Sequence, residues 1–210
     1  MRTVRAALAA LATAATLVAA STPAHAATTY TPNGGPAVKL VGSGITLTDL
    51  PANQAFTCTA STLDGPVASP GTSRTYGSAT AALTSTTGPC TNAVVGPTTV
   101  TQFGSWSLGV TGDEVAGAPG RWPARLDGVR LRMRSSSCDL TLEGTVEGTF
   151  DEATQRFTPR TGASGLVITA AGGTYCALVL DMRAGDEIEV GGHWTNVPPA
   201  GSTALTVDNP

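Results

Sequence analysis

Strict alternation of apolar and polar residues constrains this chain most, and it is clearest between residues 129 and 150. One parity of this run is apolar or small: Cys138, Leu140, Leu142, Gly144, Val146, Gly148 and Phe150. The other parity from 139 to 149 carries only Asp, Thr and Glu. Successive side chains of a strand point to opposite faces, so the pattern predicts extended segments with one buried face and one solvated face.

The preceding segment, Val129 to Arg134, alternates in the same way and is expected to pair with this run as a hairpin. Its apolar residues and its arginines occupy opposite faces, so a register slip of one residue would set an arginine against a leucine. A turn centred on Ser136 and Ser137 keeps the two faces separate. It predicts four cross-strand pairs: Met133 with Leu140, Leu131 with Leu142, Arg134 with Asp139, and Arg130 with Glu143.

Short alternating runs recur along the chain, and no stretch after the first 26 residues has apolar residues at helical spacing. A second hairpin is expected where polar turn formers separate Phe150 from Phe157. Further strands are expected over residues 37–41, 45–48, 55–60, 98–103, 106–110, 166–170, 177–181, 187–194 and 204–207. Residues 61–78 and 111–121 are expected to be loops. The predicted class is all-β: an antiparallel β-sandwich, with an open β-barrel as the alternative.

The first 26 residues carry the pattern of a signal peptide. Two arginines precede an uncharged run from Ala6 to Ala20, which is shorter than the roughly 20 residues that a membrane span requires. Ala24-His25-Ala26 then places small side chains at the −3 and −1 positions of a cleavage site. We expect cleavage after Ala26, a secreted extracellular protein without a membrane span, a flexible segment over residues 27–35, and a single all-β domain over residues 36–210.

Four cysteines, Cys58, Cys90, Cys138 and Cys176, follow this leader. An even number of cysteines in an exported chain indicates disulfides, and four cysteines allow three connectivities. We favour Cys58 with Cys90 and Cys138 with Cys176, because each bond then closes a short loop. A zinc site is the alternative, but the spacing opposes it, since no cysteine pair is close in sequence and one histidine, His193, follows the leader.

Charge disfavours nucleic acid as a partner, since 10 basic and 15 acidic residues follow the leader, a net charge of −5. No sequence feature indicates a cofactor. Calcium requires several oxygen ligands held close together. Asp181, Asp186, Glu187 and Glu189 supply such oxygens without the spacing of a calcium loop. We therefore expect no metal site.

No pattern of a catalytic centre emerges. His193 is the one histidine available as a base, and no nucleophile elbow accompanies it. Glycoside hydrolysis requires two carboxyl groups about 5–9.5 Å apart. On a strand Glu143 and Glu147 would stand about 13 Å apart, and Glu187 and Glu189 about 7 Å apart. The second spacing is common on solvated strand faces, so no catalytic residue is expected.

The arginine row Arg130, Arg132 and Arg134 is suited to an anionic polymer, because guanidinium groups match carboxylates and phosphates. The expected facing acids, Asp139 and Glu143, make internal pairing the better account of this row.

Three tryptophans, Trp106, Trp122 and Trp194, are ligand-binding candidates together with His193. An exposed aromatic row on a β-sandwich stacks on sugar rings in many extracellular modules. Each indole also suits a core, because it buries up to about 250 Å². At least two of the three are expected inside.

Several short motifs resemble a loose group of small secreted actinobacterial all-β proteins of uncharacterised function. They are the alanine-rich leader, Phe56-Thr57-Cys58, Gly88-Pro89-Cys90, Gly144-x₃-Gly148 and the late Cys176. The resemblance implies secretion, an all-β fold and paired cysteines, and it supplies no catalytic residue.

These observations favour a secreted non-enzymatic domain, either a structural component of the cell envelope or extracellular space or a ligand-binding module. A cell-wall glycan or an extracellular protein is the expected partner. One alternative is a secreted hydrolase that acts on a polysaccharide through Glu187, Glu189 or loop carboxylates. Another is self-assembly through exposed strand edges, since one lysine, Lys39, follows the leader and few residues guard such edges.

Overall fold

The computed structural model describes residues 27–209, so the expected signal peptide, residues 1–26, lies outside the described residues. The described part is almost entirely β-structure, as expected, and all its strand pairs are antiparallel. In chain order the elements are β1 (Thr29–Gly35), β2 (Ala37–Asp49), β3 (Gln54–Cys58), β4 (Ser61–Pro66), β5 (Arg74–Thr75), β6 (Ala79–Thr87), β7 (Cys90–Asn92), β8 (Gly96–Gln102), β9 (Trp106–Val110), β10 (Arg121–Arg134), β11 (Asp139–Asp151), β12 (Arg156–Pro159), β13 (Leu166–Gly172), α1 (Thr174–Leu178), β14 (Glu187–Asn196) and β15 (Thr203–Asp208).

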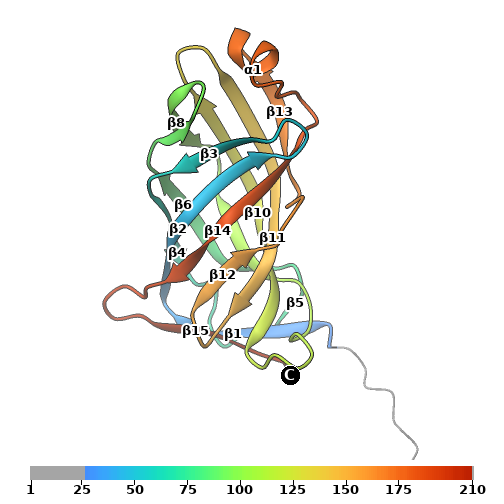
Figure 1. Ribbon diagram of the computed structural model, residues 1–210. Coiled ribbons are helices and arrows are strands. Elements are labelled where there is room, and N and C mark those ends of the chain that lie inside the picture. Colours follow the sequence, from blue (N-terminus) through green and yellow to red (C-terminus); the bar gives the residue numbers. More distant parts are fainter. Residues whose placement is uncertain (1–26, 210) are drawn as a thin grey trace, which may run out of the picture.

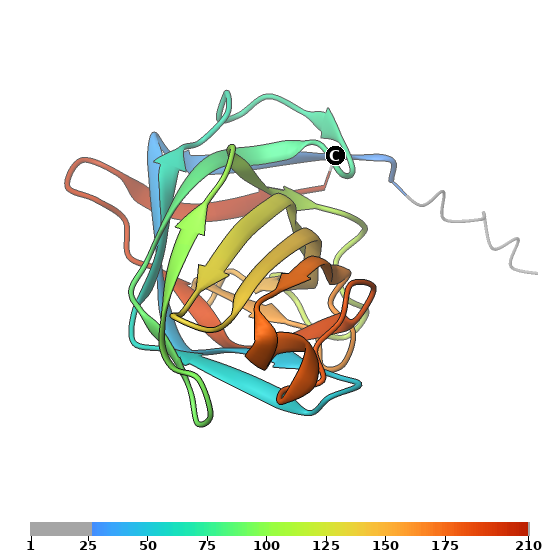
Figure 2. The same ribbon diagram turned by 90° about the horizontal axis from the view of Figure 1, so that it is seen from above.

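Twelve of these strands form one sheet that closes on itself. The long strands β2, β10, β11 and β14 run through the whole molecule (Figure 1). At one end β3, β7, β8 and β13 complete the ring, and at the other end β4, β6, β9 and β12 complete it. Figure 2 looks along the enclosed space. This closure brings the fold nearer to the barrel alternative than to two separate sheets.

The two ends of the closed sheet differ. The helix end carries α1 and the short strands β3, β7, β8 and β13 (Figure 1). The terminal-sheet end is covered by a separate three-stranded sheet of order β15-β1-β5.

The long strands change partners at bulges. β10 pairs with β9 up to Asp127 and with β8 from Leu131, and its register against β11 shifts between Leu126 and Val129. Gly128, inside this shift, has a φ of +67°. Such a backbone is strained for residues with a Cβ atom, and bulges of this kind increase the local twist. The bulge therefore lets one strand serve both rings.

The predicted β10–β11 hairpin is confirmed residue by residue. All four expected cross-strand pairs occur, from Arg134 opposite Asp139 to Arg130 opposite Glu143. The apolar parity of β11 is buried at Leu140, Leu142, Val146 and Phe150. The second hairpin is confirmed as well, with Phe150 opposite Phe157. The solvated and buried faces of these strands were thus readable from alternation alone.

The core fills the inside of the closed sheet. Buried side chains of the long and short strands form one apolar cluster. A smaller cluster of Tyr30, Val110, Trp122 and Val207 attaches the terminal sheet. Among residues 27–209, no helix has the length and apolar character of a membrane span.

Three local expectations were wrong. Residues 27–35, expected to be flexible, contain β1, whose pairing with β15 builds the terminal sheet. Residues 61–78, expected to be a loop, contain β4 and β5, and Ser61 and Leu63 are buried. Residues 177–181, expected to be a strand, follow or belong to α1. In each case long-range packing overrides a weak local pattern.

The outer edge of β15 is occupied by side chains of the β11–β12 turn. The Gln155 Oε1 atom accepts the Leu205 N–H at 2.9 Å, and its Nε2 donates to the Leu205 carbonyl at 2.8 Å. The Glu152 Oε1 atom accepts the Val207 N–H at 2.7 Å. These groups take the place of a neighbouring strand. Together with the closure of the large sheet, they weaken the interpretation of assembly through free edges.

Candidate functional site

The three tryptophans predicted as binding residues are all buried, with exposed fractions of 6% for Trp106, 3% for Trp122 and 4% for Trp194. The Trp122 Nε1–H donates to Glu152 at 2.7 Å, and the Trp194 Nε1–H donates to Ser61 at 3.0 Å. They therefore form no exposed row for stacking on a sugar. Their positions follow the expectation that at least two indoles would belong to the core.

The enclosed space offers little room for a ligand. Its cavity measures about 30 Å³ and is lined by Trp106, Trp194 and aliphatic side chains from several strands. A cavity of this size has room for water but not for a sugar ring. A sugar or lipid inside the sheet would require the core to be displaced.

His193 does not join the tryptophans in a site. It is half-buried on β14, opposite Ser43 of β2, while the neighbouring Trp194 points to the opposite face. Alternation along the strand separates the two side chains.

Most of the carboxylates considered for hydrolysis or metal binding are held by other groups, whereas Glu187 is exposed on the surface. Glu143 pairs with Arg130 at 3.0 Å, and Glu147 pairs with Arg160 at 2.7 Å. Glu189 accepts the Gly162 N–H at 2.9 Å. Within residues 27–209, no group of three or more His, Cys, Asp or Glu side chains is arranged to hold a metal ion.

A polar hollow lies at the helix end, between the β10–β11 turn and α1. We call it the rim pocket. It has a volume of about 370 Å³ and is lined by Arg134, Ser135, Ser136, Ser137, Cys138, Asp139, Gly173, Thr174 and Tyr175. This combination of hydroxyl, guanidinium and phenol groups at an open rim is suited to binding a polar ligand.

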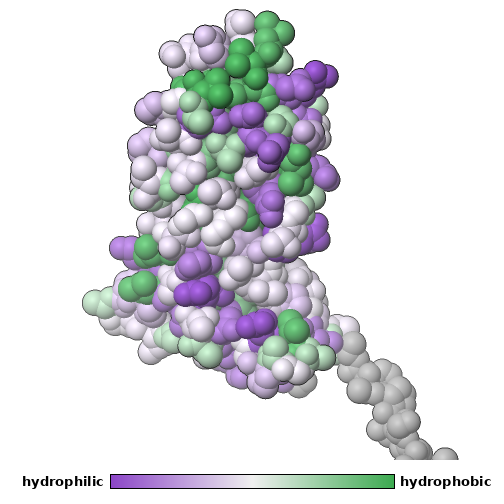
Figure 3. All heavy atoms as spheres, viewed as in Figure 1, coloured by the Kyte–Doolittle hydropathy of each residue, from purple (hydrophilic) through white to green (hydrophobic). Residues whose placement is uncertain are grey.

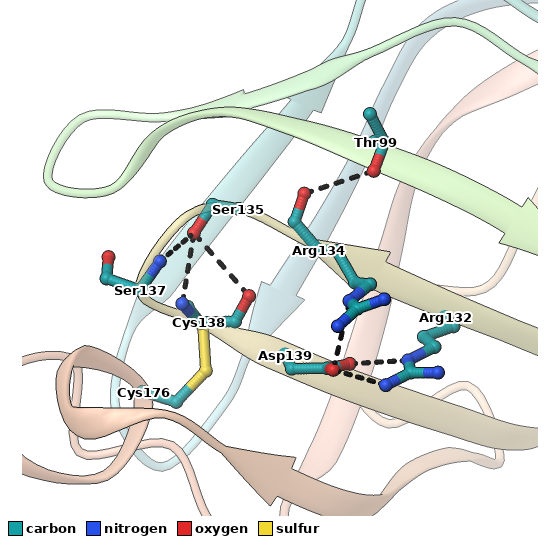
Figure 4. Close-up of polar contacts among 8 residues, drawn as sticks. All are labelled: Thr99, Arg132, Arg134, Ser135, Ser137, Cys138, Asp139 and Cys176. Carbon is teal, nitrogen blue, oxygen red and sulfur yellow. Dashed lines mark hydrogen bonds and ion pairs between the residues drawn. A yellow bond between two sulfur atoms is a disulfide. The ribbon is translucent and has the colours of Figure 1, made fainter.

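The serine turn forms one wall of the rim pocket. The Ser135 Oγ atom accepts the N–H of Cys138 at 3.1 Å and that of Ser137 at 3.4 Å (Figure 4). The Ser135 N–H donates to the Cys138 carbonyl at 2.8 Å. The Ser135 hydroxyl therefore stabilises the turn. The Ser136 side chain, at the tip of this turn, is exposed.

A disulfide joins the two walls. Cys138 at the start of β11 is bonded to Cys176 in α1 (Figure 4). The Tyr175 N–H also donates to the Ser137 carbonyl at 3.3 Å. Gly173 has a φ of +86°, and a Cβ atom there would lie 2.4 Å from the Ser137 carbonyl oxygen. A glycine is therefore required where α1 approaches the turn.

The second predicted disulfide, Cys58 to Cys90, is also confirmed and also lies at the helix end, where it links the paired residues of β3 and β7. The helix end is thus cross-linked twice, and one of the two bonds, Cys138–Cys176, joins the walls of the rim pocket itself. A site whose walls are joined in this way loses little conformational freedom when a ligand binds.

The charged side chains at and beside the rim pocket carry excess positive charge. The Asp139 carboxylate accepts the Arg132 Nε–H at 2.7 Å and pairs with the Arg134 Nε atom at 3.2 Å (Figure 4). The hydrogen bond from Arg132 holds the pKa of Asp139 below its usual value. Two guanidinium groups thus share one carboxylate, and the Arg134 side chain is 61% exposed. The Arg134 backbone is fixed by Thr99, whose hydroxyl donates to its carbonyl at 3.2 Å.

An apolar rim borders the pocket on α1. Tyr175, Leu178 and Val179 are exposed, and Figure 3 shows apolar atoms gathered at this end of the molecule. The sequence analysis identified the arginine row and the Ser136-Ser137 turn but not Tyr175. Its position directly before Cys176 places its backbone at the disulfide that joins the walls.

Comparison with protein-family models, curated proteins and solved structures finds no match to this chain.

Proposed function

We propose that this protein is a secreted, non-enzymatic binding module that holds an acidic cell-wall glycan in the rim pocket. The observation that carries the proposal is the juxtaposition of exposed Arg134, the serine turn and Tyr175 on walls joined by the Cys138–Cys176 disulfide. The guanidinium, hydroxyl and phenol groups match the acidic groups, the hydroxyls and the apolar ring faces of such a ligand.

Each group has a role in this proposal. The Arg134 guanidinium donates hydrogen bonds to a carboxylate or phosphate, for which its planar geometry is suited. The hydroxyl of Ser136 exchanges hydrogen bonds with sugar hydroxyls. The exposed ring of Tyr175 covers the apolar face of a sugar.

An extracellular location agrees with the covalent structure. Both disulfides join buried cysteines, and such bonds persist in oxidising compartments. The expected signal peptide and the resemblance to exported actinobacterial proteins are further support for proposing secretion.

The carboxylates favour binding over hydrolysis. A glycosidase requires an acid whose pKa is raised beside a second carboxylate in a cleft. Among the carboxyl groups of residues 27–209, the pKa is raised for Asp49 and Glu152, and burial is the main cause in both. Asp49 is fully buried, and Glu152 is hydrogen-bonded to Trp122 and Val207. Neither lines the rim pocket.

The test is binding of the purified oxidised chain to cell-wall fractions and to a panel of neutral, carboxylated and phosphorylated glycans. The wild type is expected to retain acidic glycans. Arg134→Ala and Tyr175→Ala are each expected to weaken binding at least tenfold, which corresponds to about 1.4 kcal/mol.

Arg121→Ala is the matched control, because Arg121 is another exposed, acid-paired arginine at the opposite end of β10. It is expected to bind like the wild type. Absence of binding to every fraction and glycan would refute the proposal, as would equal losses in Arg121→Ala and Arg134→Ala. Release of reducing sugar ends during the assay would favour the hydrolase instead.

A further inference from the structure

Residues 173–186 form a cap over the helix end of the core. Within this cap segment Cys176, Leu180 and Met182 are buried. Its backbone is tied down at both ends. The Tyr175 N–H donates to Ser137, and the Gly185 N–H donates to the Ile168 carbonyl at 2.8 Å.

Where the cap returns to the sheet it meets a fully buried carboxyl group. Asp49, the last residue of β2, has an exposed fraction of 0%. Its Oδ1 atom accepts the Ala52 N–H at 2.9 Å. Its Oδ2 atom is buried and accepts no hydrogen bond from a protein group in the described chain. A buried ionised carboxylate left in this way is costly.

The neighbour of Asp49 is a second carboxyl group. The Leu50 N–H donates to the Glu187 carbonyl at 3.0 Å, which places Asp186, at the end of the cap segment, beside Asp49, and the two carboxyl groups interact. Its Oδ2 atom accepts the Arg183 N–H at 2.6 Å, and its carbonyl accepts the Ile168 N–H at 2.9 Å. Two carboxyl groups form a hydrogen bond when one of them keeps its proton.

We propose that Asp49 keeps a proton that it donates to Asp186 in a hydrogen bond, and that this proton fastens the cap segment to the end of β2. When the proton is lost, the buried Asp49 and the half-buried Asp186 both carry a negative charge and the cap opens. This device is independent of any ligand in the rim pocket, although Thr174 and Tyr175 of the cap line that pocket. It makes the fit of the cap depend on the acidity of the surroundings.

The other charged groups near Asp49 do not neutralise the negative charge that it carries once this proton is lost. From the cap, Asp181 adds negative charge, and the Arg183 guanidinium is paired with Asp181 at 3.0 Å. From β14, Glu187 contributes its backbone carbonyl to the Leu50 N–H and exposes its side chain. From β3, the residue opposite Asp49 is the uncharged Gln54.

The direction of the pH effect follows from these surroundings. Burial, followed by the negative charges of Asp186 and Asp181, raises the pKa of Asp49 above 3.8, against the lowering effect of the Ala52 N–H. The open cap exposes Asp49 to water and returns its pKa to the ordinary value. The clamp is therefore complete below pH 3.8 and is lost as the pH rises through the raised value. Within this window the opening equilibrium grows by up to about tenfold per pH unit, and it is constant above it.

Amide hydrogen exchange of the full oxidised chain tests this device. The informative amides are those of Leu180 and Met182, which are bonded within the cap, and that of Gly185, which bonds the cap to Ile168 of β13. Exchange in the wild type is compared at each pH with Asp49→Asn, because the ratio of rates removes the intrinsic pH dependence. The side-chain amide introduced by Asp49→Asn would keep an acceptor for Ala52 and donate to Asp186 at every pH.

The expected ratio for the cap amides, wild type over Asp49→Asn, rises with pH and then becomes constant. Amides of the β10–β11 hairpin serve as the internal control and keep one ratio throughout. A ratio for the cap that does not change with pH would overturn the proposal, because a merely structural contact would lower protection equally at all pH values. If Asp49→Asn does not fold, Asp186→Asn gives the same comparison, since its amide donates to an ionised Asp49.

Discussion

Glu152 fastens the last strand to the closed sheet through a single oxygen atom. Its Oε1 accepts the indole N–H of Trp122 and the backbone N–H of Val207, both at 2.7 Å. Glu152→Ala leaves both donors without this acceptor, and each buried donor left unpaired costs about 1–3 kcal/mol. Because this site is partly exposed, we expect a loss near the lower part of that range for each donor, about 3 kcal/mol in total.

Glu152→Gln keeps an oxygen in place and is the informative partner. We expect it to lose less than about 1 kcal/mol at neutral pH, because its amide oxygen still accepts both hydrogen bonds. For a domain of this size, the loss in Glu152→Ala corresponds to a fall in Tm of about 6–12 °C. Urea unfolding followed by tryptophan fluorescence and by circular dichroism measures both variants.

The pH dependence of these variants has a definite sign. Burial raises the pKa of Glu152 above 4.5, and the hydrogen bonds from Val207 and Trp122 oppose this shift. A raised pKa in the folded state stabilises the fold below pH 4.5, and this stability is lost as the pH rises through the raised value. The advantage of the wild type over Glu152→Gln is therefore expected to shrink with rising pH. Equal losses in the Ala and Gln variants, or an advantage that grows with pH, would refute this reasoning.

Three further predictions concern the closed sheet. Replacing both Cys58 and Cys90 by alanine is expected to lower the free energy of unfolding by about 4 kcal/mol, because the bond closes a loop with a separation of 32 residues; urea midpoints of the double variant and the wild type measure this, and an unchanged midpoint would contradict it. Arg130→Glu places like charges opposite Glu143 and is expected to cost up to about 1 kcal/mol, while the double exchange Arg130→Glu with Glu143→Arg recovers most of it; failure of the exchange to recover stability would argue against the pairing. Gly148→Ala places a Cβ atom 2.3 Å from the Thr158 carbonyl oxygen and is expected to cost about 1–3 kcal/mol, whereas Thr149→Ala, on the other face, should cost less than half as much in the same thermal unfolding experiment.

Alternation predicted the strands whose two faces meet different environments. In the β10–β11 hairpin a one-residue slip would set two of the three arginines opposite leucines, so the alternation favoured a loop of even length. The disulfides were predicted from loop length, and the structure adds a reason, because Cys58 and Cys90 are direct partners on β3 and β7.

The failures have a common origin in segments whose order comes from distant partners. Ser61–Pro66 has few apolar residues, yet it forms β4 because β2 and β6 bind it on both sides. The run from Ala177 to Asp181 is apolar enough for a strand, but Cys176 is bonded to Cys138 and the chain turns there as α1. Short apolar runs do not distinguish a strand from a buried helical turn.

The candidate site was only half predictable for the same reason. Arg134 and the serine turn belong to one hairpin, so their proximity follows from local sequence. Tyr175 reaches them through the Cys138–Cys176 bond and a contact between α1 and Ser137. Closure of the sheet is a further property of long-range pairs, and no single strand pattern contains it.

Both sulfur bridges fasten the helix end, whereas the terminal sheet is held by hydrogen bonds and apolar packing. We expect fluctuations that expose backbone to begin at β1 and β15, where no covalent link limits them. A protease in the surroundings would then cut the two chain ends first and leave the rim pocket intact. The molecule would thus tolerate trimming at one end without losing the surface at the other.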